Sequence, residues 1–274
     1  MPVVERIALG LEYHGGSFKG WQSQAGGGTV QDALEQALAE IAGDKVRVAA
    51  AGRTDAGVHA LVQVVHFDVM RPRPLQAWVR GTNTYLPATI AVRWAASVPQ
   101  SFHARFSATA REYRYMLWNH PVRPAVAAGQ VGWTHAALDL SVMQSALSAV
   151  LGRQDFSALR SSECQAKSPV RTVYEATVQQ SGHWFQFHIR ADGFLHHMVR
   201  NLVGALIQIG RGRHDPSWLA SLLASRDRRL GAPTFAPDGL YLSGVQYDQC
   251  WNLPAEDLIR QIPCWPRWAV VDGH

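Results

Sequence analysis

An aspartate among small residues is the side chain of this sequence best suited to chemistry. Asp55 stands in the stretch 52–57, GRTDAG, where its neighbours are too small to shield the carboxylate. The glycines at both ends allow sharp bends and a close approach of other backbone. A carboxylate presented in this way can act as a nucleophile or as a base. The alternative is that Arg53 and Asp55 form an ion pair that only ties down the loop.

Segments rich in β-branched and apolar residues lie on both sides of this loop. Residues 45–51 precede it and residues 61–68 follow it, and both patterns are typical of strands. Because packed strands form a rigid frame, we expect them to hold the Asp55 carboxylate in a fixed position.

The first part of the chain shows apolar periodicities that predict the order β-α-β-β-α-β. Its first helix has a clear start, because Thr29 and Asp32 form a capping box, and a clear end at Gly43. The predicted elements are a strand over 7–13, a helix over 30–41, strands over 45–51 and 61–68, a helix over 75–86 and a strand over 91–98.

The second part repeats this order with one inserted helix, which Asp215 and Pro216 open. The predicted elements are a strand over 111–118, a helix over 140–151, strands over 170–180 and 184–190, a helix over 195–209, the inserted helix and a strand over 239–247. Only the order of predicted strands and helices is repeated, since the two parts show no visible similarity in sequence.

This organisation predicts an α+β protein of two ferredoxin-like halves, whose antiparallel sheets join across a central catalytic cleft. We assign residues 1–104 to the first half, which carries the Asp55 loop, and residues 105–274 to the second half. The end of the chain is rich in tryptophan, so we expect it to pack back onto the body. The tryptophans concerned are Trp251, Trp265 and Trp268.

Composition argues against several functional classes. The chain has 274 residues, of which 47% are hydrophobic, enough for a real core. It has no run of about 18 apolar residues and no signal-peptide pattern at its start, so we expect a cytoplasmic protein without membrane contact. The 3 cysteines lack a CxxC spacing and the 12 histidines lack a metal-ligand pattern, which predicts buried or idle thiols and no metal.

The positive charge of the chain comes almost entirely from arginine. The formal net charge is +5, and only Lys19, Lys45 and Lys167 are lysines. Arginine binds phosphate with a flat two-pronged fork and stacks on bases, so this bias points toward a nucleic-acid partner, and a merely basic soluble protein is an equal alternative on charge alone. The candidates for phosphate contacts are Arg71, Arg73, Arg105, Arg123, Arg211 and Arg213.

Six stretches in chain order resemble motifs of the tRNA pseudouridine synthase A family, and together they span about residues 7–247. They are 13–22, 29–31, 52–60, 111–115, 194–201 and 239–242. Each motif is weak alone, but six in one register are a specific signal. The chain departs from the family pattern at His14, where an acidic residue is common, and in the glycine-rich segment 23–28.

The resemblance implies an enzyme that isomerises uridine to pseudouridine in tRNA, with no cofactor and no metal. Family members act at positions 38, 39 and 40 (tRNA numbering) of the anticodon stem-loop as homodimers, so tRNA and a second copy of the chain are the expected partners. By resemblance, Asp55 is the essential catalytic carboxylate, Tyr113 stacks on the target uracil and Arg200 pairs with Asp55. We also assign Arg53 and Phe194 to substrate binding.

The reaction explains why these residue types are needed. The target base must leave its stack, which costs a few kcal/mol and calls for an aromatic platform such as Tyr113. Asp55 must be ionised either to attack the sugar or to abstract a proton, and an ionised carboxylate in a dry pocket needs a cation such as Arg200. The alternatives are a core aromatic for Tyr113 and a solvated helix arginine for Arg200. We interpret His196 and His197 as packing or backbone-capping groups.

Two other functions fit parts of the sequence. A base-modifying deaminase would need a zinc site of the His/Cys/Cys kind, and the missing CxxC spacing argues against it. A catalytically inert RNA-binding module would bind RNA through the aromatic residues of its sheets, and Asp55 would then be idle. Incubation with uridine-containing tRNA separates these possibilities, because only a synthase gives pseudouridine.

Overall fold

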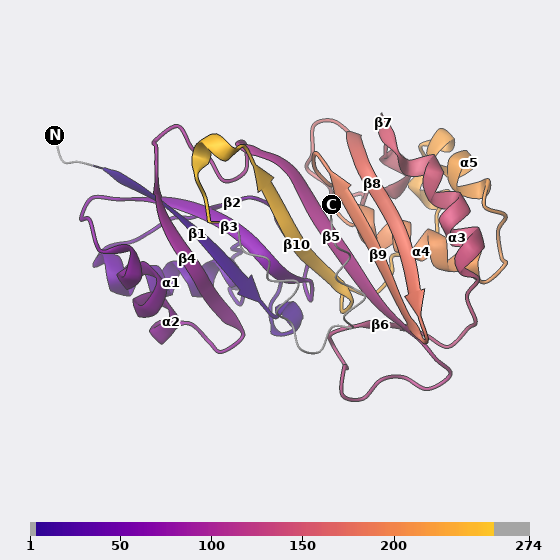
Figure 1. Cartoon of the computed structure of the whole chain (residues 1–274), viewed down its shortest axis with the longest axis horizontal. Helices are drawn as coiled ribbons and strands as arrows, with labels where there is room; N and C mark the ends of the chain where they lie inside the picture. The colour runs from indigo at the N-terminus through magenta and orange to yellow at the C-terminus, as the bar shows by residue number, and fades with distance from the viewer. Residues whose placement is uncertain (1–3, 255–274) are drawn as a thin grey trace. The chain divides into compact units, whose positions relative to one another are not determined.

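The computed structural model describes residues 4–254, and these residues fold into two compact units. The first unit holds residues 4–109 and 242–254, and the second unit holds residues 110–241. Two strands, β5 (Ala108–Asn119) and β10 (Leu240–Tyr247), contribute residues to both units. Figure 1 shows the helices and strands of each unit.

Alternating apolar residues at the start of the chain form β1 (Glu5–Tyr13), the central strand of the first unit. It pairs antiparallel with β3 (His59–Val69) on one side and with β4 (Ile90–Val98) on the other. The short strand β2 (Ala49–Ala50) pairs antiparallel with β3. β1 is buried from Ile7 to Leu11 and at Tyr13, and none of these positions carries a charged side chain.

The first helix, α1 (Val30–Ala42), has the boundaries that the sequence predicts. The Thr29 hydroxyl accepts the N–H of Asp32, which satisfies one of the unpaired donors at the helix start. Such a cap contributes about 1 kcal/mol. Gly43 ends the helix in the left-handed region, with φ of 70°.

The second predicted helix of this unit is irregular. Residues 75–86 form a π-helical turn, Ala77–Gly81, followed by the short helix α2 (Thr82–Tyr85). A Cβ atom at Gly81 would lie 2.7 Å from Cδ1 of Ile41, so the glycine allows the two helices to approach closely at this point. Figure 1 shows α1 and α2 together beside the sheet of the first unit.

The predicted strand over 45–51 is also shorter than expected. Ala49 and Ala50 pair with β3, and the N–H of Ala51 donates to the Val64 carbonyl at 2.8 Å. The N–H of Val48 donates to the carboxylate of Glu35 at 3.0 Å, so this donor is bound to a side chain of α1 and not to a neighbouring strand.

The sheet of the second unit is antiparallel over four strands. Its order is β5, β9 (Trp184–Ala191), β8 (Val170–Ser181) and β7 (Gly152–Asp155). The short strand β6 (Gly132–Thr134) pairs with β5 in parallel. The β8–β9 hairpin turns at Gly182, which has φ of 56° and supplies the left-handed conformation that a tight turn needs.

Three α-helices belong to the second unit: α3 (Leu140–Leu147), α4 (Met198–Gly210) and α5 (Trp218–Ser225). α3 packs against α4 and against β8. The sequence predicts a start of α4 near residue 195, but the helix begins at Met198 because His197 has φ of 64°, outside the helical region. The apolar stripe of α4 is buried as predicted.

Both units are therefore mostly antiparallel sheets with a few helices, which confirms the mixed α and β class predicted from the sequence. The core of the second unit contains the completely buried rings of Tyr115, Phe185 and Phe187. Burial of one such aromatic side chain contributes about 1.5–3 kcal/mol, so these rings anchor β5 to β9.

The tryptophan-rich end lies only partly within the described residues. Trp251 packs edge-on against Phe102 of the first unit, with ring centroids 5.3 Å apart, whereas Trp265 and Trp268 lie outside the described residues.

Cys164 and Cys250 are free thiols. None of the helices within residues 4–254 is long and apolar enough to cross a membrane.

Candidate active site

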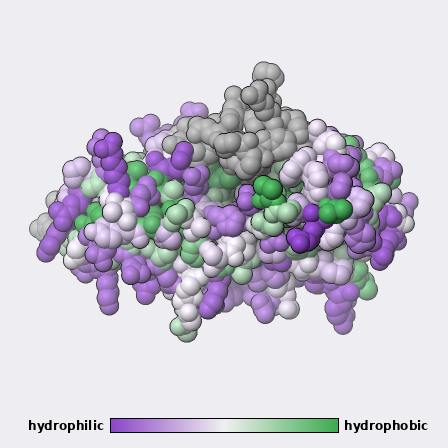
Figure 2. Space-filling view, turned by 90° about the horizontal axis from the view of Figure 1, so that it is seen from below, coloured by the Kyte–Doolittle hydropathy of each residue, from purple (hydrophilic) through white to green (hydrophobic). Residues whose placement is uncertain are grey.

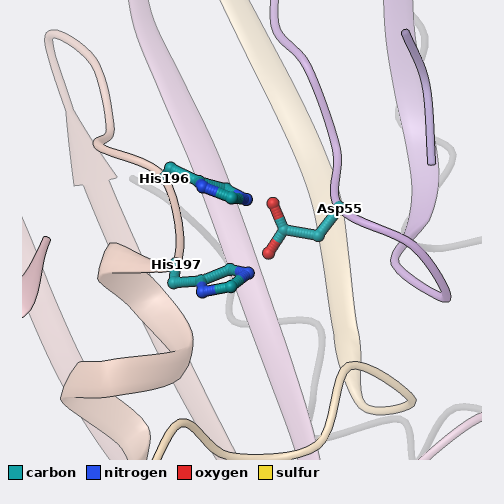
Figure 3. Close-up of side chains that lie close together, drawn as sticks. All are labelled: Asp55, His196 and His197. Atoms are coloured by element: carbon teal, nitrogen blue, oxygen red, sulfur yellow. The ribbon is translucent and has the colours of Figure 1, made fainter. Parts of the chain in front are cut away.

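The loop that joins β2 to β3 carries Asp55, whose side chain is half-buried. Figure 3 shows this carboxylate projecting from the loop. The preceding residue, Thr54, is buried, and its hydroxyl lies 2.8 Å from the hydroxyl of Tyr13. The N–H of Val58 donates to the Asp55 carbonyl at 3.1 Å. The loop is thus fixed immediately before and immediately after the carboxylate.

Two glycines allow the segment 13–22 to lie directly on this loop. A Cβ atom at Gly15 would overlap the carbonyl oxygen of Val58. Gly20 has φ of 91°, and a Cβ atom there would lie 2.9 Å from the carbonyl oxygen of Thr54. Packing against the Asp55 loop therefore explains why this motif needs glycine at both positions.

Buried neutral groups anchor the same region. The N–H of Gly15 donates to Nδ1 of His59 at 3.0 Å, and the side-chain amide of Gln63 donates to the Gly52 carbonyl at 2.7 Å. Burial raises the pKa of Tyr13 to about 12, so its hydroxyl stays protonated at neutral pH. Arg53, assigned to substrate binding from the sequence, is exposed on the loop.

The structure brings together two of the residues predicted from the sequence, Tyr113 and Phe194. Tyr113 lies on β5 opposite Ile189 of β9, and 8% of its surface is exposed. Its ring meets the ring of Phe194 edge to face, with centroids 4.9 Å apart and planes at 84°. Such a pair is worth about 0.5–1.5 kcal/mol beyond burial, so Phe194 supports one edge of the Tyr113 ring.

Arg200 lies in the first turn of α4 and is half-buried. Its Nε donates to the carbonyl of Phe235 at 2.8 Å, and the N–H of Phe235 donates back to the Arg200 carbonyl at 3.3 Å. This reciprocal pair ties the guanidinium to the segment 231–239, which precedes β10. Arg200 is therefore held by its own unit and is not a freely rotating surface arginine.

The residues His196 and His197 form the turn that leads into α4 (Figure 3). Their rings lie 3.9 Å apart between centroids. The carbonyl of His196 accepts the N–H of Ser161 at 3.0 Å, and the carbonyl of His197 accepts the N–H of Asn201 at 2.9 Å. The His197 backbone thus takes part in the first turn of α4, and the His196 backbone ties this turn to Ser161.

Asn201, which the sequence places only at the end of the motif 194–201, has a central place in the structure. Asn201 is 2% exposed and lies one residue after Arg200 on α4. The signal for it was available, because an asparagine stands next to the apolar stripe of a helix that is otherwise nearly all apolar. A buried amide must be hydrogen-bonded, so such a residue marks a built contact.

The arginines proposed for phosphate contacts are mostly at the surface. Five of them are exposed and Arg211 is half-buried; the exposed ones are Arg71, Arg73, Arg105, Arg123 and Arg213. Figure 2 shows a face on which hydrophilic residues predominate and apolar residues form small patches. Exposed arginines of this kind suit the sequence-independent part of RNA binding.

Comparisons of the sequence with known proteins show the family to which the chain is related. A family model described as tRNA pseudouridine synthase matches residues 11–107 and 146–248 of the chain. Two relatives are named tRNA pseudouridine synthase A. The protein of Dechloromonas aromatica (strain RCB) is 59% identical over 91% of this chain and 95% of its own length. The protein of Methylobacillus flagellatus is 57% identical over 94% of this chain and 98% of its own length.

A solved structure of a Cbf5-Nop10-Gar1 complex is 13% identical, with a TM-score of 0.34 over 73% of this chain and 45% of that chain. This TM-score is too low to support a conclusion, so the assignment depends on the sequence matches. Those matches extend over most of the chain and confirm the resemblance seen in its motifs. The chain therefore belongs to the tRNA pseudouridine synthase family, whose members are isomerases that convert uridine to pseudouridine.

Proposed function

We propose that this chain isomerises uridine at positions 38, 39 and 40 of the tRNA anticodon stem-loop, without a metal or an organic cofactor. The observation that carries the proposal is the Asp55 carboxylate, half-buried on a loop fixed at both ends. The reaction breaks the bond from C1′ to N1 of uracil and forms a bond from C1′ to C5. The proton on C5 is lost and N1 gains a proton, so no oxidant or reductant is required.

Asp55 is the catalytic carboxylate in this proposal, and Arg200 is the cation that keeps it ionised in the complex with tRNA. Attack on the sugar and proton abstraction both need the charged carboxylate. A cation within about 4–6 Å favours that form in a site from which RNA excludes water. The fixed Nε contact of Arg200 to Phe235 supports this role, because it orients the guanidinium before the substrate arrives.

Tyr113 stacks on the flipped uracil, Phe194 supports the tyrosine ring, and Arg53 contacts a phosphate. Base-aromatic stacking is worth about 1–3 kcal/mol and many phosphate contacts remain without it, so Tyr113→Ala should reduce turnover far more than tRNA affinity. Equal turnover of this variant and the wild type at saturating tRNA would contradict the stacking role.

Position-resolved chemistry tests the substrate. Transcripts of one tRNA with uridine at positions 38, 39 and 40 are incubated with the protein, and pseudouridine is mapped chemically. In three further transcripts cytidine replaces one of these uridines at a time. Each replacement should remove the signal at that position only. Product at other positions would contradict the anticodon assignment, and no product from any transcript would contradict the reaction itself.

We also propose that the two halves are ferredoxin-like, in the arrangement predicted from the sequence. Support comes from the first unit, where β4, β1, β3 and β2 follow one another as antiparallel neighbours. In the second unit β5, β9 and β8 are antiparallel neighbours in the corresponding order. The division between residues 104 and 105 and the catalytic cleft between the halves stay predictions.

A homodimer in the cytoplasm is the working form that we propose. A tRNA is long and highly charged, and the exposed arginines support a broad phosphate-binding surface. Each neutralised phosphate steepens the log-log salt dependence of binding by about 0.7–0.9. We expect tRNA affinity to fall steeply as salt rises, and sedimentation to show a dimer that persists at the same salt. A fully active monomer would contradict the dimer. A flat salt response would contradict phosphate-led binding.

A further inference from the structure

The buried amide of Asn201 connects three separate segments of the second unit. Its Nδ2 donates to the carbonyl of Leu159 at 2.7 Å. Its Oδ1 accepts from the hydroxyl of Thr234 at 2.7 Å and from Nη2 of Arg228 at 3.0 Å. Arg228 Nη2 also donates to the Thr234 hydroxyl at 3.2 Å, which closes a triangle of polar side chains. The amide thus makes three of its four possible hydrogen bonds within the unit.

The segment 231–239 lies against α4 along this triangle. A Cβ atom at Gly204, one helical turn beyond Arg200, would lie 2.5 Å from the carbonyl oxygen of Pro233. The hydroxyl of Tyr115 donates to the carbonyl of Ala236 at 2.9 Å. The segment is therefore pinned on both sides of Phe235, the residue whose carbonyl accepts the Nε of Arg200.

We propose that Thr234, Asn201 and Arg228 are positioning residues that orient the Arg200 guanidinium through the carbonyl of Phe235. The inference rests on the proposed function, in which Arg200 is the cation beside Asp55. Thr234 is adjacent to Phe235 in the chain, so a shift of Thr234 also moves the acceptor of the Arg200 Nε–H. No member of the triangle needs to touch the substrate for this effect.

Electrostatic catalysis depends strongly on such positioning. A group that is displaced by about 1 Å can lose about a hundredfold in rate, although its charge is unchanged. An arginine side chain has many rotamers, and one Nε contact with a fixed carbonyl selects among them. If the triangle is broken, Arg200 keeps its charge but loses its fixed direction, so turnover should suffer while phosphate-led tRNA binding should not.

Variants of Thr234 separate positioning from folding. Thr234→Val removes the hydroxyl at nearly constant volume, and Thr234→Ser retains it. We expect Thr234→Val to lower the single-turnover rate about tenfold with tRNA affinity within about twofold of wild type, and Thr234→Ser to keep the rate. Thr177→Val is the matched control, because Thr177 lies on β8 outside the triangle. Thermal unfolding of each variant shows that the rates refer to folded protein.

The decisive measurement repeats Thr234→Val in an Arg200→Lys background. If Thr234 acts through the Arg200 guanidinium, its replacement should matter little once that guanidinium is gone. The effect of Thr234→Val on the single-turnover rate should then shrink from about tenfold to less than about twofold. Equal effects in both backgrounds would overturn the positioning role and leave the proposed function intact. Wild-type turnover of Arg200→Lys alone would instead overturn the proposed role of Arg200, and with it this inference.

Discussion

The Asp55 loop and the start of α4 are both held in one conformation, but by different kinds of contact. Around Asp55, the backbone of the segment 13–22 packs directly on the loop, because Gly15 and Gly20 have no side chain in the way. The side chains of Tyr13 and His59 add hydrogen bonds to this backbone-led contact. At the start of α4 the contacts come from the side chains of Asn201, Arg228 and Thr234. The first region therefore needs glycine at two positions where a side chain would collide with backbone, whereas the second needs the hydrogen-bonding groups of three side chains.

This difference determines how each region should respond to substitution. Adding a methyl group at a glycine in the first region should displace the backbone that carries the carboxylate. Removing one hydroxyl in the second region should change orientation and leave the fold in place. The reaction rate, in contrast, should depend on one functional group in each region, the Asp55 carboxylate in the first and the Arg200 guanidinium in the second.

The largest expected effect comes from Asp55→Asn, which leaves both scaffolds intact. Loss of a nucleophile or base commonly costs a factor of about 10⁴–10⁶, so the single-turnover rate should fall at least about a thousandfold. Affinity for tRNA should stay within about threefold of wild type, because many phosphate contacts remain. Asp44→Asn, an exposed aspartate of the same unit, is the control. A variant that retained a tenth of the wild-type rate would exclude Asp55 as the catalyst.

The next effect is expected from Gly15→Ala, which tests the backbone-led region. Because the new Cβ atom would overlap the Val58 carbonyl, either the segment 13–22 or the Asp55 loop must move. We expect a loss of about 3 kcal/mol in the free energy of unfolding, the upper end of overpacking costs, together with reduced turnover. Gly52→Ala is the matched control, since nothing lies within 4 Å of a Cβ atom there. Equal unfolding midpoints for the two variants would contradict this account of the loop.

A smaller effect is expected from Gly204→Ala in the other region. Alanine gains about 1 kcal/mol in helix propensity over glycine, but its Cβ atom would meet the Pro233 carbonyl at 2.5 Å. The net change should be a loss of about 1–2 kcal/mol in unfolding free energy, with turnover lowered through the displaced segment 231–239. Gly210→Ala is the comparison, because the atoms nearest to a Cβ there belong to the side chains of Met143 and Leu138 and not to backbone. A stabilised and fully active Gly204→Ala would show that the segment does not depend on this approach.

The two regions also differ in how far the sequence predicts them. The Asp55 loop is set by local signals, namely bracketing glycines and flanking apolar segments, and the structure places it between β2 and β3 as expected. The capping box at Thr29 and the glycine at position 43 likewise determine α1 within its own residues.

The features that were missed depend on contacts between distant residues. α4 begins later than its apolar pattern indicates, because His197 takes a left-handed backbone conformation. The strand expected over 45–51 shortens because Glu35 accepts the N–H of Val48. The hydrogen bonds of Asn201 with Leu159 and Thr234 join residues 42 and 33 positions apart, and no periodicity reports such a pair.

The smallest expected effect is a pH dependence of stability that comes from His66, which lies on β3 of the first unit. Nδ1 of His66 on β3 accepts the N–H of Ala104 at 3.1 Å, so it must be unprotonated. Burial, with help from the nearby charges of His103 and Arg6, lowers the pKa of His66 from 6.5 to about 4, although Asp68 acts in the opposite direction. Between these values the unfolded chain binds a proton that the folded chain does not. Stability from this group is therefore complete above about pH 6.5 and is lost as the pH falls towards 4.

Unfolding midpoints measured between pH 7 and pH 5 test this prediction. The midpoint of the wild type should fall over this range, and His66→Gln, which keeps an acceptor but does not titrate, should flatten the dependence. His183→Gln is the control, because His183 is exposed on the turn between β8 and β9. The side chains of Asn201 and Thr234 do not titrate, and arginine stays charged throughout this range, so the triangle around α4 should not contribute. An unchanged slope in His66→Gln would show that another group causes the pH dependence.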